Sequence, residues 1–373
     1  MRVLVAPDSF GGTLTAPEAA DAIAAGWRQA VPAAHLDLVP LSDGGPGFVD
    51  VLATSLDGQR RVVDTRGPLG DPVAASLLVV DDTGYVESAQ VAGLHLLGTE
   101  RLDPRRASTY GVGELIAAAI PGIHRVVVGL GGTATNDGGA GMWAALGAQP
   151  ADRLAAGGAG LAELTEVLPP HPLPLTLVAA TDVDNPLLGP NGASAVYGPQ
   201  KGADRAAVLD LDDALRRWAD LVETRTAQPG LRERAGAGAA GGLGFGLIAL
   251  GAAVVSGFGV VADAVGLADR VAGADLVVTG EGSLDGQSLR GKVVVRVARA
   301  AQEAGIPCVV IAGRSDVGNR EAAAAGIDDI QSVAGLLGSR EAALAAGADG
   351  VRQAAATLAR RWAGLGISEP PTT

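Results

Sequence analysis

Cysteine and aromatic residues are the scarcest components of this chain. Cys308 is the single cysteine among 373 residues, and aromatic residues make up 3% of the sequence. One cysteine excludes a disulfide framework, and its position in an apolar run fits a reducing cytoplasm. Because large aromatic side chains are rare, we expect a core built from Ala, Val and Leu.

The chain also has few basic residues and no long uninterrupted apolar runs. The chain has 28 Lys and Arg against 41 Asp and Glu, a formal net charge of −13. This excess of negative charge argues against nucleic acid or an anionic membrane surface as a partner. Glycine and charged residues interrupt the apolar runs well short of a membrane span. Met1 and Arg2 lead directly into the apolar residues 3–6, so we expect no signal peptide. We therefore expect a globular cytoplasmic protein with no membrane partner.

Glycine, by contrast, is abundant, with 55 residues that lie mostly in discrete loops between apolar segments. One such loop lies within residues 125–142, RVVVGLGGTATNDGGAGM. Its β-branched residues 126–128 predict a strand, and a helix is expected from Met142. Between them, closely spaced glycines allow backbone N–H groups to approach a ligand, and a helix N-terminus favours an anion there. The alternative is a tight turn with a purely structural role.

Strands and helices alternate at both ends of the sequence, which is typical of a parallel α/β sheet. Near Arg60 the pattern changes, because the predicted strands 74–81 and 85–88 are joined by an Asp/Gly turn and so form an antiparallel hairpin. We predict an α/β fold with a parallel-sheet domain formed by residues 1–66 and 266–373, and an inserted α/β domain of mixed topology formed by residues 67–265. Helices are expected at 206–223, 243–255 and 340–365, and the tail 368–373 is expected to be frayed.

Two glycine motifs match nucleotide-binding patterns only in part. Residues 129–134 satisfy G-x-G-x-x-A after a predicted strand, but no second strand ending in an acidic residue follows at the spacing that a dinucleotide site requires. Residues 286–292 have the spacing G-x-x-x-x-G-K, but Val293 stands where a phosphate-binding loop has the Ser or Thr that holds Mg²⁺. The sequence therefore argues against a dinucleotide-dependent dehydrogenase and against a P-loop enzyme.

Acidic side chains gather in loops that follow predicted strands, where such sheets bind their ligands. Phosphoryl transfer needs carboxylates for Mg²⁺ or for the hydroxyl proton, and cations or N–H groups for phosphate oxygens. The four histidines lie outside these loops, which argues against hydrolysis by a histidine-bound metal. The acidic residues are Asp43, Asp137, Asp182, Asp184, Glu281 and Asp285, and the cations in loops of the same kind are Lys201, Arg290 and Lys292.

Motifs rich in glycine recur along the chain from Met1 to about Ala312. They are PDSFGGTLTA (7–16), PLSDGGPG (40–47), ASTYGVGELI (107–116), GLGGTATNDGGAGM (129–142), TDVDNPLLGPNGA (181–193), YGPQKGA (197–203), GAGAAGGLGFG (236–246) and TGEGSLDGQSLRGK (279–292). Together these motifs resemble the type-one glycerate kinase family. The resemblance implies a kinase that uses ATP and Mg²⁺ to phosphorylate D-glycerate, generally to 2-phosphoglycerate. It also implies a Rossmann-like domain from both chain ends, an inserted α/β domain, and an active site in the cleft between them.

The resemblance and the loop chemistry assign candidate roles to these residues. The candidate catalytic residues, for Mg²⁺ or for activation of the substrate hydroxyl, are Asp43, Asp184, Asp182 and Asp137. The candidates for binding substrate or phosphate are Asp8, Ser9, Gly131, Gly132, Thr133, Asn136, Lys201, Arg290 and Lys292. The candidate metal ligands are Glu281 and Asp285. We expect residues 125–142 to face the active site from the side opposite to Asp8 and Asp43.

Two positions depart from the family pattern. Gly11 stands where the first loop of the family usually has lysine, and Pro46 stands where the second loop usually has glutamate. Loss of a cation beside the transferred phosphate removes electrostatic stabilisation, for which Lys201, Arg290 or Lys292 is a candidate replacement.

Three hypotheses therefore stay open. The first is a glycerate kinase, and the second is a kinase for a related small hydroxy acid such as tartronate or a longer aldonate. The third is a catalytically weakened or purely ligand-binding member of the family. The sequence decides neither between the 2- and 3-phosphate products nor the oligomeric state, for which a homo-oligomer is one alternative.

Overall fold

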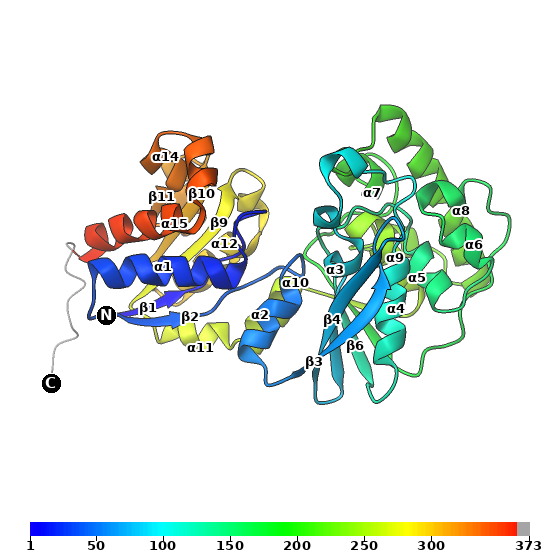
Figure 1. Cartoon of the computed structure of the whole chain (residues 1–373), viewed down its shortest axis with the longest axis horizontal. Helices are drawn as coiled ribbons and strands as arrows, with labels where there is room; N and C mark the ends of the chain where they lie inside the picture. Colours follow the sequence, from blue (N-terminus) through cyan, green and yellow to red (C-terminus); the bar gives the residue numbers. More distant parts are fainter. Residues whose placement is uncertain (364–373) are drawn as a thin grey trace. The chain divides into compact units, whose positions relative to one another are not determined.

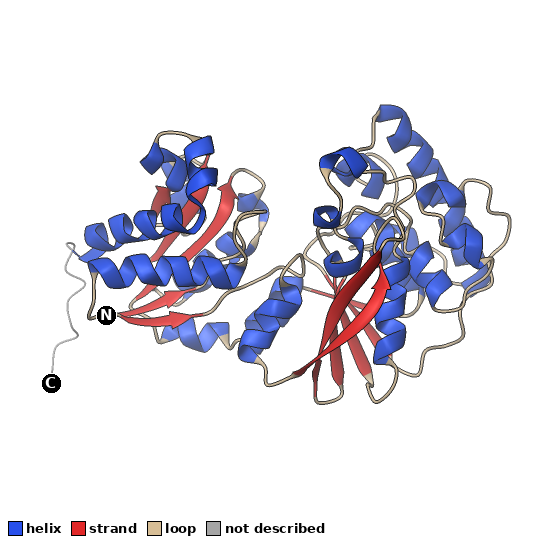
Figure 2. Ribbon diagram, viewed as in Figure 1, coloured by secondary structure: helices blue, strands red, loops and turns tan. Residues whose placement is uncertain are grey.

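The computed structural model describes residues 1–363, and of Arg290 it describes only the backbone. The chain divides into two compact units, one formed by Met1–Ser42 with Val261–Thr373 and the other by Asp43–Val260. Each unit has a sheet of its own, drawn in red in Figure 2. We call them the terminal unit and the inserted unit, and describe each by itself.

The terminal unit contains a five-stranded sheet in the order β11-β10-β9-β1-β2, in which every neighbouring pair is parallel. Because all the strands run in one direction, their carboxyl ends lie along one edge. The strands are β1 (Arg2–Val5), β2 (His35–Leu38), β9 (Leu276–Leu284), β10 (Cys308–Ser315) and β11 (Asp329–Ser332).

Helix α1 (Ala16–Ala30) and helix α15 (Arg340–Ala363) lie side by side in this unit (Figure 1). Glycine is required where they touch, because a Cβ at Gly26 would lie 2.1 Å from the carbonyl oxygen of Arg352. Helix α1 begins with a capping box, in which the N–H of Glu18 donates to Thr15 Oγ1 and the N–H of Thr15 donates to Glu18 Oε2. The other helices of the unit are α11 (Leu267–Ala272), α12 (Val293–Glu303), α13 (Asn319–Ala324), α14 (Val333–Leu337) and the 3₁₀ turn η6 (Ser288–Arg290).

The inserted unit contains a six-stranded sheet whose strands follow sequence order, β3-β4-β5-β6-β7-β8. The first three strands pair antiparallel, and β4 and β5 form the predicted hairpin, whereas β5 to β8 pair parallel. The carboxyl ends of these four parallel strands therefore share one edge. The strands are β3 (Gln59–Arg66), β4 (Pro72–Val80), β5 (Thr83–Glu87), β6 (Arg125–Gly129), β7 (Thr176–Ala180) and β8 (Ala253–Val255).

Two tryptophans anchor the core of the inserted unit. Trp143 and Trp218 are fully buried and meet edge to face, with ring centroids 5.2 Å apart. Each indole N–H donates to a glycine carbonyl, that of Gly246 for Trp143 and that of Gly138 for Trp218. The helices of the unit are α2 (Phe48–Ser55), α3 (Ala89–Ala92), α4 (Tyr110–Ala119), α5 (Ala140–Ala145), α6 (Ala151–Leu154), α7 (Ala193–Tyr197), α8 (Arg205–Thr226) and α9 (Ala239–Ala249), and α10 (Gly257–Ala264) continues into the terminal unit.

The predicted fold class is confirmed: both chain ends build a parallel sheet, and the middle of the chain builds a mixed one. The first predicted boundary, residue 66, follows β3, whereas the structure pairs β3 with β4 and begins the inserted unit at Asp43. The predicted helix 243–255 is wrong in its last turn, because Gly251 at φ +89° follows the helix and residues 253–255 pair with β7. The predicted frayed tail, 368–373, lies outside the described residues.

Candidate active site

The loops predicted to carry the chemistry of the inserted unit follow the carboxyl ends of β6 and β7. We call residues 130–139 the Gly131 loop. Its start is held by the neighbouring strand ends: the N–H of Leu130 donates to the carbonyl of Ala180 at 2.9 Å, and the Ser88 hydroxyl donates to the carbonyl of Gly129 at 2.8 Å. This loop therefore lies at the edge of the sheet where α/β proteins bind ligands.

Residues 43–47, which we call the Asp43 loop, pack directly against the same edge. A Cβ at Gly131 would lie 2.7 Å from the Cα of Gly45, and a Cβ at Gly129 would lie 2.6 Å from the carbonyl oxygen of Gly44. The two loops approach backbone to backbone, which only glycine permits at these positions. The expectation that residues 125–142 face Asp43 from the opposite side is wrong, since both loops belong to the inserted unit and touch each other.

Asp137 lies at the end of the Gly131 loop and is completely buried. Its carboxylate accepts hydrogen bonds from the backbone N–H and the hydroxyl of Thr109, both at 2.8 Å, and from the N–H groups of Gly139 and Gly141. Burial raises the pKa of Asp137, and these four donors oppose the rise. Such contacts join the start of α4 to the start of α5, so the carboxylate orders the loop from inside.

Lys201 enters the same region from the 3₁₀ turn η4 (Pro199–Lys201) and is only 2% exposed. Its ammonium group donates to the carbonyl of Thr135 at 2.6 Å and to the hydroxyl of Thr133 at 3.4 Å. Burial lowers the pKa of Lys201 to about 7, and the negative charge of Asp137 opposes the shift. The structure therefore brings together Thr133, Asp137 and Lys201, three of the predicted site residues.

Asn136 completes this buried polar group. Its Nδ2 donates to the hydroxyl of Ser194 at 2.8 Å, while Asn136 Oδ1 and the hydroxyl of Thr135 are buried without a hydrogen-bond partner. Buried polar atoms are nearly always satisfied by protein or ordered water. These two oxygens are therefore available to a polar ligand or to water molecules.

Asp182 and Asp184 follow β7 but differ in their surroundings. Asp182 accepts hydrogen bonds from the Ser256 hydroxyl at 2.6 Å and from the N–H of Phe258 at 2.8 Å, so it ties the β7 loop to the start of α10. Asp184 is exposed. The pKa of Tyr197 is raised mainly by burial and to a smaller extent by the negative charge of Asp184.

The terminal unit brings a second set of predicted residues to the carboxyl edge of its own sheet. The N–H of Asp8 donates to the carbonyl of Gly280 at 2.8 Å, so the loop after β1 runs along β9 next to Glu281. The N–H of Ser9 donates to Asp8 Oδ1 at 2.6 Å. This contact links the two polar residues directly after the strand end.

Asp285 and Lys292 lie in the loop that follows β9. Asp285 accepts from the N–H groups of Gln287 and Ser288. Burial raises the pKa of Asp285, but these hydrogen bonds together with the positive charges of Lys292 and Arg314 outweigh burial and hold the pKa below its usual value. Lys292 occupies the N-cap of α12, and Arg290 ends η6 with its side chain outside the described structure. In residues 1–363 no group of three or more His, Cys, Asp or Glu is arranged to hold a metal, so a Glu281–Asp285 metal pair stays a prediction.

The two departures from the family pattern have different surroundings. Gly11 is exposed, and a Cβ there would meet no atom within 4 Å, so nothing in the structure prevents a side chain at this position. Pro46 packs on the Gly131 loop, since a Cβ at Gly132 would lie 2.6 Å from Pro46 Cγ. Gly132, at φ +62°, is thus required both by its conformation and by Pro46.

One buried acid near these loops escaped the sequence analysis. Glu87, the last residue of β5, is 4% exposed and accepts hydrogen bonds from the N–H groups of Gly47 at 3.1 Å and Val49 at 3.2 Å. Burial raises the pKa of Glu87 to about 7 in spite of these donors. The signal that could have drawn attention to it was a charged glutamate inside the predicted strand 85–88.

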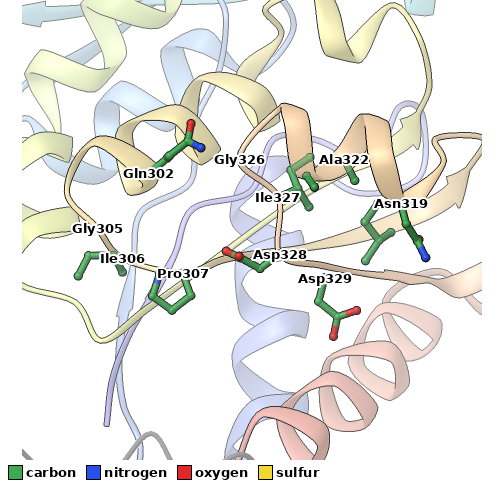
Figure 3. Close-up of a pocket in the computed structure, with 12 residues that line it drawn as sticks. Gln302, Gly305, Ile306, Pro307, Asn319, Ala322, Gly326, Ile327, Asp328 and Asp329 are labelled. Carbon is green, nitrogen blue, oxygen red and sulfur yellow. The ribbon is translucent and has the colours of Figure 1, made fainter.

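A cavity of about 650 Å³ in the terminal unit is not a phosphate site by its chemistry (Figure 3). It lies where β10 and β11 begin, the edge of the sheet opposite to Asp8 and Asp285. Its lining includes Asp328 and Asp329 and no basic residue. Asp328 accepts the N–H of Cys308, and Asp329 pairs with Arg361, so both carboxylates have structural partners.

Across the described residues, no helix has the length and apolar character needed to cross a membrane.

Comparisons with known proteins identify relatives over nearly the whole chain. The chain is 41% identical over 354 residues to a glycerate kinase of Halalkalibacterium halodurans, with 92% of this chain and 93% of that protein covered. It is 39% identical over 357 residues to glycerate 2-kinase of Escherichia coli K12, with 92% and 93% covered.

A solved structure extends the likeness to the whole fold. The crystal structure of a protein assigned as glycerate kinase 2 from Salmonella typhimurium LT2 superposes with a TM-score of 0.77 at 37% identity, covering 98% of this chain and 100% of that one. The profile of the glycerate kinase family matches residues 3–363, nearly the whole sequence. The chain therefore belongs to the glycerate kinase family.

Proposed function

We propose that this chain is a phosphotransferase that moves the γ-phosphoryl group of ATP to the 2-hydroxyl of D-glycerate. The observation that carries the proposal is the meeting of the Asp43 loop and the Gly131 loop at the carboxyl edge of β6 and β7. Both loops bear motifs of the family, and both bring carboxylates and backbone N–H groups to one place. Membership of the family supports the reaction type, and the loops supply residues that suit it.

The reaction needs few covalent steps from the protein. The substrate hydroxyl oxygen forms a bond to the γ-phosphorus, the bond from that phosphorus to the β–γ bridging oxygen breaks, and ADP leaves. The hydroxyl proton passes to a carboxylate, for which Asp43 and Asp184 are the candidates. Asp137 is enclosed by its four donors, so we assign it to ordering the Gly131 loop.

The oxygens of the phosphates and of the substrate need hydrogen-bond donors or cations. In the inserted unit these are the backbone of Gly131 and Gly132, the Thr133 hydroxyl and Asn136. In the terminal unit they are Ser9, Arg290 and Lys292. Lys201 acts through Thr133 and Thr135, whose oxygens it binds, and so supports the Gly131 loop.

The carboxylates suit a magnesium ion that is carried by ATP. Mg²⁺ in kinases is bound by one or two carboxylates together with phosphate oxygens, and not by an all-protein cage. The donor set offers single carboxylates: Asp43, Asp182 and Asp184 in loops of one unit, and in the other Glu281 in β9 and Asp285 in the loop after it. The ion, when bound, neutralises charge on the phosphates and orients them.

A coupled assay of ADP release with D-glycerate, ATP and Mg²⁺ tests this function. We expect turnover with kcat in the ordinary range of kinases, about 1–100 per second. Phosphorus NMR of the product distinguishes 2-phosphoglycerate, which we expect, from 3-phosphoglycerate. Absence of turnover with D-glycerate would refute the proposal.

A second candidate is a kinase for a related small hydroxy acid. Gly11 and Pro46 favour it, because both alter loops that carry proposed site residues. A panel of D-glycerate, tartronate and longer aldonates, assayed side by side, decides between the two. A kcat/KM for another acid above that for D-glycerate would establish the second candidate. Cell fractionation tests the expected cytoplasmic location. Light scattering of the purified protein measures its oligomeric state.

A further inference from the structure

The end of β5 and the segment that follows it contact both loops of the proposed active site. Glu87 and Ser88 are consecutive: the Glu87 carboxylate accepts from Gly47 and Val49, while the Ser88 hydroxyl donates to the carbonyl of Gly129. Farther along, the N–H of Leu94 donates to the carbonyl of Gly132 at 2.9 Å. One short segment thus ties the Asp43 loop to the Gly131 loop.

Glu87 supplies the side-chain cap that helix α2 lacks at its N-terminus. The N-cap of α2 is Gly47, at φ +89°, and no side chain of its own caps the first turn. The first N–H groups of a helix have no partner inside the helix and attract a carboxylate. Glu87 binds the N–H groups of Gly47 and Val49 from another strand, 40 and 38 residues away in sequence.

The Asp43 loop is therefore held at both ends. The N–H of Gly45 donates to Asp43 Oδ1 at 3.1 Å, which closes the first half of the loop. Pro46 has no N–H to donate. The second half depends on Glu87, whose carboxylate also receives the side-chain amide of Gln90. Val49 is fully buried, so without Glu87 its N–H loses its partner away from water.

We propose that Glu87 is a positioning residue, which holds the Asp43 loop against the Gly131 loop so that Asp43 is placed for phosphoryl transfer. The inference rests on the proposed function for the role of Asp43, whereas the contacts of Glu87 are observed independently of that function. Misplacing a reacting group by about 1 Å costs on the order of a hundredfold in rate. Glu87 has no contact with the transferred group in this role and acts through the loop.

Hydrogen exchange and kinetics on the full chain test the proposal. We expect Glu87→Ala to raise deuterium uptake in peptides covering residues 43–52 and to leave uptake in α8 unchanged. In the same variant kcat falls at least tenfold, while KM for ATP changes less than threefold, since the loop positions reacting groups more than it binds ATP. Glu87→Gln keeps one acceptor oxygen in the same place and recovers most of the lost kcat.

Glu114→Ala is the matched control. Glu114 is a half-buried carboxylate of the same unit that accepts the N–H of Arg66 at 3.0 Å, outside both loops. The proposal is overturned if Glu87→Ala exchanges like the wild type over residues 43–52. It is also overturned if Glu114→Ala, at an equal loss of melting temperature, loses as much kcat.

The exchange experiment separates this inference from the proposed function. If the wild type shows no turnover with D-glycerate, the proposed function fails, and exchange alone still decides whether Glu87 holds the loop. If exchange rises in Glu87→Ala and kcat does not fall, Glu87 holds the loop but does not position a reacting group, and the inference fails. Where Glu87→Ala does not fold, Glu87→Gln gives the same comparison at smaller amplitude.

Discussion

Glu87 and Lys201 are two ionisable side chains that the inserted unit buries almost completely. Burial raises the pKa of Glu87 from 4.5 to about 7, so between these values the folded chain keeps a proton that the unfolded chain has lost. The free energy of unfolding therefore falls as pH rises through this window. Burial lowers the pKa of Lys201 from 10.5 to about 7, so its contribution rises with pH above 7.

The variant Glu87→Gln isolates the first of these effects. Because Gln does not titrate, we expect the wild type to lose about 3 kcal/mol of stability relative to this variant between about pH 4.5 and about pH 8. Urea unfolding at both pH values measures the difference. Glu100→Gln, at an exposed carboxylate, is the control for loss of one charge. Stability curves of Glu87→Gln and wild type that run parallel would contradict the prediction.

Gly11 is the residue at which the chain departs most directly from the kinase pattern. Its position is exposed and open, so we expect Gly11→Lys to fold with a free energy of unfolding within about 0.5 kcal/mol of the wild type. An added cation in water contributes about 1 kcal/mol at most, so kcat/KM should rise no more than about fivefold. Steady-state kinetics and thermal unfolding measure both.

Gly98→Lys is the matched control for this substitution. Gly98 is also exposed, and a Cβ there also meets no atom within 4 Å. A wild type without turnover beside an active Gly11→Lys would contradict the prediction. It would favour the catalytically weakened, ligand-binding hypothesis.

At the scale of elements, the strand ends β5 to β8 organise the inserted unit. Four carboxyl ends share one edge, and the segments that follow them support one another through Ser88, Leu130 and Ala180. The Asp43 loop belongs to this edge although it precedes β3 in the chain. Gly45 and Gly131 approach closely, backbone to backbone, where the Asp43 loop meets the Gly131 loop.

The substitution Gly131→Ala tests that contact. Gly131 has no left-handed backbone conformation, so the only cost of a methyl group is its 2.7 Å approach to Gly45 Cα. We expect a loss of about 1–3 kcal/mol in stability from overpacking, and a fall in kcat as the two loops separate. Gly98→Ala adds the same methyl group in open space and should change neither quantity. Wild-type kcat in Gly131→Ala would show that the contact is dispensable.

At the scale of the whole molecule, each unit has a hydrophobic core cluster of its own. Ile23 belongs to the core of the terminal unit and Ile116 to that of the inserted unit, and both are fully buried. Units with independent cores unfold with their own enthalpies, and a single two-state transition is not expected.

Calorimetry of two cavity-creating variants tests this independence. We expect Ile23→Ala and Ile116→Ala each to destabilise by about 2–5 kcal/mol and each to lower a different component of the unfolding endotherm. The wild type should show a calorimetric enthalpy above its van't Hoff enthalpy. If both variants shift one common transition equally, the units unfold as one.

Local pattern determined a large share of this protein. Apolar segments separated by glycine loops predicted the strands and the two-part α/β fold. This was possible because a parallel strand that is buried on both faces consists of consecutive apolar residues. The loops themselves carried the resemblance to the family. The capping box of α1 was readable for the same reason, since Thr15 and Glu18 are three residues apart.

Only the tertiary structure decided which loops meet. The contact of Gly45 with Gly131, the binding of Gly47 and Val49 by Glu87, and the pairing of residues 253–255 with β7 all join segments far apart in the chain. Such contacts depend on strand order and register, which periodicity within one segment does not contain. For the same reason Asp137 and Lys201 read as loop residues in the sequence and are buried in the fold.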